Sequence, residues 1–403
     1  VNPAIRAAQQ RVNAARARIG PAGLRPDPVL MLGVRDFPVA KPGFSDNFTM
    51  KMIGIGQTFR YPGKLRLGRL AAVHELAATE ASLAAEIRRI RQEVQAAYYD
   101  LVFLERALEI VEQNRSVLVS FIRITEARYG VGDAGQQDVL KARVETARLG
   151  ESAAELKERR PAALARLNAL LDRPTSTPVG ELAVPARIAR AAVADSASQI
   201  RFVSFALGSR AADSPLPPLA ELQETAVAEN PVLREHRARI AAQAARVDLS
   251  RKAYLPDFDV SLQYGQRDGF TDMVTAMVAI PLPLQKGRKQ DLLVADAQAE
   301  LAALEAAHHA EQNAVRAEVA RLYAELERDR AQLALYVKAI LPQGRAALAS
   351  AAASYQVGRV EFLTLLDNQA TLFNYETQYF QVLTEFAKTL AELERTVGKE
   401  ILR

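Results

Sequence analysis

The sequence predicts a mainly helical fold with a small β part, built as two copies of one plan. The first observation is a Tyr-x-Val-Gly tetrad that occurs twice, at residues 129–132 and 355–358. The second is that each tetrad closes a very long helical run and opens another, with short strand patterns ahead of each run. A repeat this long indicates a duplication, because solenoid periods are only about 20 to 50 residues. We expect the tetrads to be the tips of two helical hairpins.

Composition limits the possible functions. The chain has 403 residues, 49% apolar and 25% charged, and its lack of cysteine excludes disulfides and thiolate metal sites. The formal charge of +5 is small, and basic and acidic residues alternate along the helices, so a solvated surface is favoured and no nucleic-acid partner is expected. The sequence contains no run of about 18 apolar residues, so it predicts no membrane-spanning helix. The chain starts at Val1 without a helix like residues 219–229 of the second copy, so we expect a missing N-terminal piece that would carry any signal or lipidation site.

The first predicted repeat comprises residues 1–172. Asn2 and Pro3 open a short helix that Gly20 and Pro21 should break. The elements expected next are strands at about 29–35 and 49–59, a helix at 65–128, the tip at 129–135, and a return helix at 136–171 that Pro161 should kink or interrupt. Apolar residues of the long helix step alternately by four and three, a heptad pattern typical of coiled-coil packing.

The second predicted repeat comprises residues 219–403 and follows the same order. Residues 173–218 form a linker rich in Pro, Ser and Ala, for which the sequence predicts no definite fold, although residues 200–207 are apolar enough to pack. The elements expected after the linker are a helix opened by Asn230-Pro231, strands at about 258–265 and 273–280, a long helix at 290–354 bent by Pro342, the tip at 355–361, and a return helix at 361–397.

The four strand candidates indicate an assembly of several chains. A two-stranded hairpin is marginal in water, and strands of about this length can cross a bilayer when tilted. In lipid, strands are stable only in a closed barrel, because an open edge leaves backbone groups unpaired. Four strands are too few to close a channel. We therefore expect the chain to supply its strands to a barrel shared between several copies of itself.

This plan resembles the TolC family of outer-membrane efflux channels, over nearly the whole chain. The resemblance lies in motifs that recur in order in the two halves. They are Asn-Pro at residues 2–3 and 230–231, the two tip tetrads, Gly63-Lys64 and Gly287-Arg288 after the hairpins, residues 341–343 and 362–367 around the second tip, and residues 391–395 near the end. The end of the chain is most similar to the branch that serves heavy-metal cation pumps of the copper/silver and cobalt/zinc/cadmium type.

The resemblance implies a homotrimer whose chains are each a single outer-membrane efflux unit. Three chains would form a twelve-stranded barrel in outer-membrane lipid and a tunnel of twelve helices in the periplasm of a Gram-negative bacterium. The trimer would be a passive duct, fed by a periplasmic adaptor and an inner-membrane pump of the RND type. The substrate would be a heavy-metal cation, or alternatively a drug or other small molecule. A soluble periplasmic coiled-coil scaffold is a rival from another class, but its β domain would need contiguous strands.

No catalytic site, cofactor site or metal site is predicted, so we do not expect an enzyme. Adjacent His308 and His309 point about 100° apart on a helix and are interpreted as surface residues. All five methionines fall in the strand candidates, at positions 31, 50, 52, 273 and 277. Their thioethers either fill a lipid-facing or barrel surface or form a relay for a soft metal ion. Aromatic residues also gather around the strands, as in the girdles of membrane barrels.

The residues expected to carry function lie at the tips. By resemblance to the family, Asp138 and Asp367 occupy the places of acidic gate residues, together with Tyr355 as a partner of Asp138 in a neighbouring chain and with Thr364. In a trimer each acid would form a ring of three carboxylates, which favours cations in a pore. Both acids are also explained as exposed residues near a helix N-terminus. The expected contacts with the adaptor are Tyr129, Val131, Gly132, Tyr355, Val357 and Gly358, although plain turn geometry also explains the glycines.

Overall fold

A computed structural model of the chain describes residues 2–39, 43–132, 134–193 and 216–402. Contacts divide the chain into two compact units. The tip unit consists of Val1–Arg6, Ala84–Asn230 and Gln312–Arg403, and the sheet unit of Ala7–Leu83 and Pro231–Glu311. Each unit therefore takes segments from both predicted repeats.

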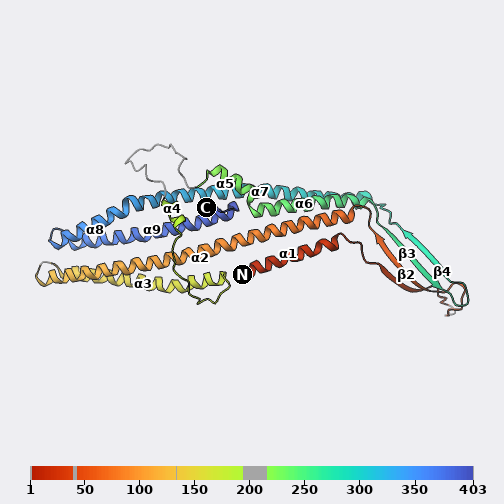
Figure 1. Ribbon diagram of the computed structural model, residues 1–403, viewed down its shortest axis with the longest axis horizontal. Coiled ribbons are helices and arrows are strands. Elements are labelled where there is room, and N and C mark those ends of the chain that lie inside the picture. Colours follow the sequence, from red (N-terminus) through yellow and green to blue (C-terminus); the bar gives the residue numbers. More distant parts are fainter. Residues whose placement is uncertain (1, 40–42, 133, 194–215, 403) are drawn as a thin grey trace. The chain divides into compact units, whose positions relative to one another are not determined.

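Both halves of the chain contain the predicted order of elements (Figure 1). The first half has α1 (Pro3–Ala22), β1 (Val29–Arg35), β2 (Met50–Phe59), α2 (Lys64–Gly130), α3 (Gln136–Leu170) and α4 (Ala186–Val193). The second has α5 (Leu219–Glu229), α6 (Pro231–Arg251), β3 (Phe258–Gln266), β4 (Met273–Ala279), α7 (Gln290–Leu335), α8 (Leu341–Gln356) and α9 (Phe362–Val397). Short turns of 3-10 helix, η2 (Lys252–Tyr254) and η3 (Lys286–Arg288), flank the second pair of strands, and a π-helical turn, η4 (Tyr336–Ile340), joins α7 to α8.

The sheet unit holds one antiparallel sheet in the order β1-β2-β3-β4. The two hairpins are joined through β2 and β3, where Ile53 lies opposite Tyr264. The four strands predicted from the sequence are therefore confirmed, with ends that differ by one residue at most. Their union in one sheet was not predicted, because pairing between segments far apart in the sequence leaves no local pattern.

A polar junction ties the two halves together where β2 ends. Asp257 Oδ1, just before β3, accepts hydrogen bonds from the backbone N–H of Tyr61 at 2.8 Å and from Lys64 Nζ at 2.7 Å. Burial acts to raise the pKa of the Asp257 carboxyl, but the hydrogen bonds from Lys64 and Tyr61 outweigh it and the pKa is lowered. Asp257 is therefore a charged acceptor at neutral pH.

The asparagines of the two Asn-Pro motifs make the same contact in the tip unit. Asn2 Nδ2 donates to the carbonyl oxygen of Leu170 at 2.7 Å, and Asn230 Nδ2 donates to that of Thr396 at 2.7 Å. Both carbonyls lie in the last turn of a return helix, where backbone acceptors lack helical partners. Each asparagine therefore caps the end of the return helix in its own half.

The hydrophobic seams of the long helices are buried to different extents. In the second half the seam predicted from the heptad pattern is buried at Val315, Val319, Leu322, Leu326 and Leu333, whereas its last member, Ile340, is half-buried in η4. In α2, buried seam residues begin at Ile90, whereas Ile87 is exposed. Within the described ranges, no helix combines the length and the apolar character needed to cross a membrane.

Neither Gly20-Pro21 nor Pro161 interrupts a helix. Helix α1 continues through Gly20 and Pro21 to Ala22 and ends directly before Gly23, and α3 is continuous through Pro161, where a kink stays a prediction. Pro21 lies in the last turn of its helix, and a proline removes only one backbone hydrogen bond from a long helix that packing holds in place. By contrast, the helix ahead of Pro342 is irregular: the π-helical turn η4 ends at Ile340, two residues before the proline, and such turns are a common cause of helix kinks.

The described part of the predicted linker packs on the tip unit. Asn168, fully buried near the end of α3, donates through Nδ2 to the carbonyl oxygens of Thr175 and Thr177, both at 2.9 Å. Tyr98 of α2 donates its hydroxyl to the carbonyl oxygen of Ala183 at 3.0 Å. The apolar stretch 200–207 lies outside the described residues.

Gly398 and Gly150 offer a matched test of backbone constraint. At Gly398, φ is +83° and an added Cβ would lie 2.6 Å from the carbonyl oxygen of Glu229, so Gly398→Ala should destabilise the fold by more than about 2 kcal/mol. At Gly150, inside α3, an added Cβ meets nothing within 4 Å, so Gly150→Ala should be neutral or stabilising by up to about 1 kcal/mol. Thermal unfolding in detergent measures both, and a similar change in the two midpoints would contradict this account.

Candidate functional site

The two tetrads form the same turn at the two tips. Gly132 has φ +85° and Gly358 has φ +72°, so both adopt the left-handed conformation that was predicted for them. Their N–H groups donate to the carbonyl oxygens of Tyr129 and Tyr355, each at 3.0 Å. Sequence and backbone conformation are thus equivalent at the two ends.

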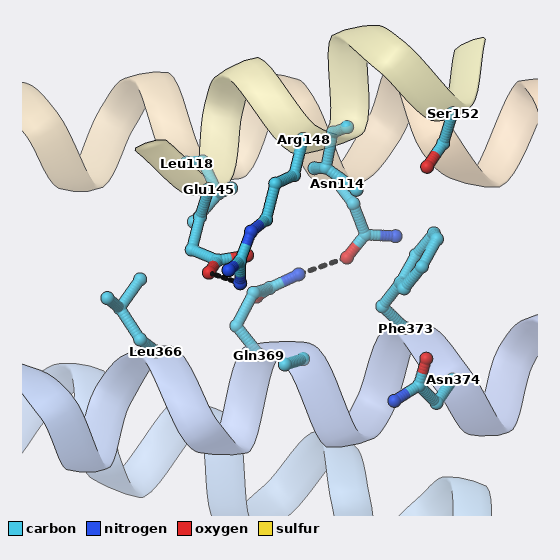
Figure 2. Close-up of a pocket in the computed structure, with 11 residues that line it drawn as sticks. Asn114, Leu118, Glu145, Arg148, Ser152, Leu366, Gln369, Phe373 and Asn374 are labelled. Carbon is cyan, nitrogen blue, oxygen red and sulfur yellow. Dashed lines mark hydrogen bonds and ion pairs between the residues drawn. The ribbon is translucent and has the colours of Figure 1, made fainter. Parts of the chain in front are cut away.

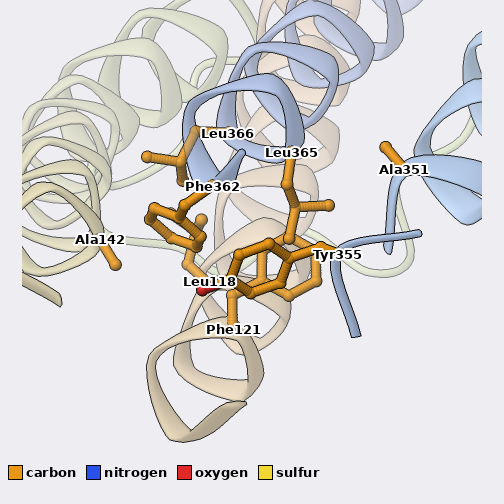
Figure 3. Packing of buried hydrophobic residues seen from close by; sticks show 8 residues of the cluster. All are labelled: Leu118, Phe121, Ala142, Ala351, Tyr355, Phe362, Leu365 and Leu366. Carbon is orange, nitrogen blue, oxygen red and sulfur yellow. The ribbon is translucent and has the colours of Figure 1, made fainter. Parts of the chain in front are cut away.

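The tyrosines of the two tetrads, however, are in opposite environments. Tyr129 is 49% exposed, whereas Tyr355 is 3% exposed and packs into a cluster formed by α2, α3, α8 and α9 (Figure 3). The other members of this cluster are Leu118, Phe121, Ala142, Ala351, Phe362, Leu365 and Leu366. The Tyr355 ring centroid lies 5.4 Å from that of Phe362. The tip of the second hairpin is therefore anchored on α2 by the Tyr355 side chain.

Arg128 of α2 completes this anchor. Its guanidinium group lies over the Tyr355 ring, 4.7 Å from the centroid, and its Nη1 donates to the Tyr355 carbonyl oxygen. At the end of the ring, the Tyr355 hydroxyl donates to Thr125 Oγ1 at 3.3 Å. We call Thr125, Arg128 and Tyr355 the tip clasp. Sequence reasoning missed Thr125 and Arg128, because nothing in the two tetrads indicates which tyrosine is buried.

The predicted gate residues lie close to the tips, near the starts of α3 and α9. Asp138 is half-buried in the first turn of α3, and Asp367 and Thr364 are exposed near the start of α9. Within the described part of the chain, neither carboxylate makes a hydrogen bond or an ion pair. The Tyr355 hydroxyl contacts Thr125 of its own chain, so its pairing with Asp138 of a neighbouring chain stays a prediction.

The predicted adaptor contacts differ in exposure. Val131 is 73% exposed and Val357 is 67% exposed, so each turn presents an apolar side chain at its apex. Leu363, one residue into α9, is exposed as well. Tyr355 is the exception, since its side chain is buried in the clasp. Exposed apolar residues at the end of a hairpin are typical of a surface that another protein covers.

A cavity of about 240 Å³ opens between α2, α3 and α9, behind the tip clasp (Figure 2). Its floor is crossed by a hydrogen bond from Gln369 Nε2 to Asn114 Oδ1, and both side chains are buried. Arg148 pairs with Glu145 at 2.6 Å on the α3 side. Gln369 Oε1 is buried beside the cavity and has no hydrogen-bond partner in the described residues. Its volume holds several water molecules at about 30 Å³ each.

The strand register separates the sheet into two unlike faces. Residues directly opposite each other in an antiparallel sheet point to the same side. One face, the apolar face, carries Leu30, Leu32, Val34, Ile53, Ile55, Phe59, Phe258, Val260, Leu262, Tyr264, Val274, Ala276 and Val278, together with the polar residues Lys51, Gln57 and Gln266. The opposite face, the polar face, carries Thr58, Asp259, Ser261, Gln263, Thr275, four glycines and all five methionines. The sequence alone did not show on which face of the sheet each side chain of the second strand lies, and the register assigns them.

The apolar face is large and exposed in the single chain. Leu32 is 70% exposed, Val274 is 68% exposed and Leu262 is 52% exposed. Such a continuous apolar surface is unfavourable in water and needs a cover. Aromatic side chains lie at both ends of the strands. Phe59 stacks on Phe258 at 5.4 Å at one end, and Phe37 meets Phe44 at 5.5 Å beyond the other.

A histidine pair and a buried aspartate lie in the helices, away from the tip turns and the strands. His236 of α6 and His308 of α7 have ring centroids 6.1 Å apart, and burial, His236, Arg237 and His309 all lower the pKa of His308. Asp329, 2% exposed in the seam of α7, has its pKa raised by burial, although Arg328 donates to its Oδ1 at 2.7 Å. No group of three or more His, Cys, Asp or Glu residues that could hold a metal occurs in the described residues.

Comparison with known proteins identifies a family for this chain. A family model described as "Outer membrane efflux protein" matches residues 1–173 and 222–399. The chain is similar to the cobalt-zinc-cadmium resistance protein CzcC of Cupriavidus metallidurans, with 26% identity over 337 residues, which cover 83% of this chain and 73% of CzcC.

Solved structures agree in fold. The outer-membrane channel OprN superimposes with a TM-score of 0.79 at 19% identity, over 100% of this chain and 88% of OprN. CusC, whose structures were described for conformational changes accompanying folding and transmembrane channel formation, superimposes with a TM-score of 0.78 at 17% identity, over 99% of this chain and 89% of CusC. At these identities the likeness shows the fold.

The tip clasp can be tested by removing Arg128. Arg128→Ala removes the guanidinium group from the Tyr355 ring and its charged hydrogen bond, which contributes about 1.5 to 3 kcal/mol. Amide hydrogen exchange at residues 355–362 should therefore accelerate by about tenfold or more. Arg123→Ala, which truncates an exposed side chain in the same helix, is the control and should leave exchange unchanged. Equal exchange rates at these amides in the two variants would contradict the clasp.

Proposed function

The chain belongs to the outer membrane efflux protein family, and from this premise we propose that three copies assemble into a passive duct that exports substrate from the periplasm. The observation that carries the proposal is the sheet, which has one exposed apolar face and two open edges. Membership of the family places the chain in the outer membrane.

The open edges favour assembly through the sheet. Among the described residues, β1 and β4 each have only one neighbouring strand, so each leaves a row of backbone N–H and C=O groups without a strand partner. In lipid such groups cost several kcal/mol each unless a further strand pairs with them. Pairing β4 of one chain with β1 of the next satisfies both edges, and three chains would then close a barrel of twelve strands.

The two faces indicate how this barrel would be oriented. The apolar face would contact acyl chains, and the polar face, with its glycines, serine and threonines, would line the interior. β2 has 10 residues, which span about 33 Å, enough to cross the hydrocarbon core with a tilt. The aromatic pairs at both strand ends would lie at the two membrane interfaces.

The tips would form the gate and the docking surface for partners. In a trimer, Asp138 and Asp367 would each form a ring of three carboxylates, with Thr364 beside Asp367, and such rings attract cations. Val131 and Val357 are exposed at the turns beside Gly132 and Gly358 and would contact the periplasmic adaptor. The adaptor would link the duct to an inner-membrane pump that supplies the energy.

A heavy-metal cation is the substrate that we favour. CzcC is by name a cobalt-zinc-cadmium resistance protein, and this chain is similar to it over most of its length. Two rings of acidic residues in the proposed gate suit a cationic substrate better than a neutral or anionic one.

Assembly is tested by the mass of the detergent-extracted particle, from light scattering with the detergent contribution subtracted. The expected protein mass is three times the 44.1 kDa chain. Replacing Leu262 with Arg on the apolar face should prevent recovery from the outer-membrane fraction, because a charge at mid-bilayer costs about 2 to 4 kcal/mol. Ser261→Arg on the polar face is the control and should be recovered normally. A monomeric particle that stays soluble without detergent would remove the barrel.

The gate is tested in planar bilayers. The double variant Asp138→Asn and Asp367→Asn should reduce the preference for K⁺ over Cl⁻, because both carboxylate rings lose their charge. Glu158→Gln removes an exposed acid from the same helix as Asp138, farther from the tip, and should leave the reversal potential unchanged. If the double variant keeps the selectivity of the original protein, these acids are ordinary helix-start residues.

A further inference from the structure

The methionines are distributed in a way that core packing does not explain. All five methionines of the 403-residue chain lie in the strands, and the register places all five on the polar face. A methionine that served as an apolar filler or contacted lipid would be expected on the apolar face or in the helical seams. None of the five lies in either place.

Three of these side chains surround one glycine. Gly265 of β3 pairs with Met52 of β2 on one side and with Met273 of β4 on the other. A Cβ added to Gly265 would lie 2.9 Å from Met52 Sδ and 3.0 Å from Met50 Sδ. The two sulfur atoms therefore converge over the glycine, and their separation is at most the sum of these distances. Met273 pairs with Gly265 from β4, so its side chain points to the same face of the sheet.

The chemistry of this cluster is selective. Thioether sulfur is a soft ligand that suits Cu(I) and its heavier analogue Ag(I), whereas carboxylate and carbonyl oxygen suit hard cations. Arg35 lies opposite Met50 on the polar face and forms an ion pair with Asp36 at 3.6 Å. No carboxylate shares the Met52–Gly265–Met273 row. Hard divalent cations therefore find no suitable ligands in this row.

We propose that Met50, Met52 and Met273 form a thioether site for a soft monovalent metal ion on the polar face of the sheet. The site needs only the sheet of one chain. Its meaning for transport rests on the proposed function, since in a trimer the site would occur three times inside the barrel and would give a soft monovalent ion in transit a place to bind within the membrane.

A purely steric role makes a different prediction. Methionine can cover a strand glycine, as Met31 does at Gly56, where an added Cβ would lie 3.2 Å from Met31 Cε. Such a cover requires shape and apolar character, which leucine also provides. Replacing methionine with leucine therefore separates the two roles, because it keeps the cover and removes the sulfur ligand.

The test uses the purified protein in detergent and Ag(I) as the probe, followed by equilibrium dialysis. One Ag(I) per chain should bind, and Zn(II) should not. Met50→Leu with Met52→Leu should weaken Ag(I) binding by more than about tenfold, since loss of outer-shell partners alone costs that much at metal sites. Met277→Leu is the control, because Met277 lies opposite Ser261, two rows from the cluster, and should bind Ag(I) as the original protein does.

A second measurement covers the case in which the double variant does not fold. The original sequence, labelled with selenomethionine, should show selenium neighbours of bound silver by X-ray absorption. Oxygen-only neighbours, or equal Ag(I) affinity in the double variant and in Met277→Leu, would overturn the site. The particle mass is independent of both results. A trimer that does not bind Ag(I) refutes only the site, and a monomer that binds it refutes only the proposed duct.

Discussion

The backbone hydrogen bonds at the edges of the sheet are the constraint on which the rest of the molecule depends. Four strands pair internally in the order β1-β2-β3-β4, and the first and last are left with a free side. Among the described residues, no further element pairs with these edges in the way that a strand would. The apolar face adds a second demand, since its side chains are exposed in the single chain. Both demands are met together when further chains extend the sheet within lipid.

Local patterns in the sequence were sufficient for the elements but not for their partners. Alternation at residues 258–264 and glycine at each tip predicted the strands and the turns, because these depend on neighbouring residues. The prolines at 21 and 161 were misleading, since packing along a long helix outweighs one lost hydrogen bond. Helix continuity there is decided by tertiary contacts.

The candidate sites also divide into features that the local sequence predicts and features that depend on tertiary contacts. The tip glycines could be identified from the tetrads, and the structure places both in the expected conformation. The burial of Tyr355, its stacking with Arg128 and the common face of the methionines depend on which strand or helix lies beside which, and one sequence does not contain that information. The positions of Asp138 and Asp367 in one chain are known. Their proposed gate role stays a prediction, because a ring of carboxylates forms only between chains.

The tip clasp gives the two hairpins of one chain different ends, although their turns are the same. One presents an exposed Tyr129, and the other withdraws Tyr355 beneath Arg128. In a ring of three such chains, the six hairpins would alternate between two kinds, so the ring would have threefold rather than sixfold rotational symmetry at its tips. A partner ring of six identical subunits would then meet two inequivalent surfaces in turn, and its subunits would bind in two distinct ways.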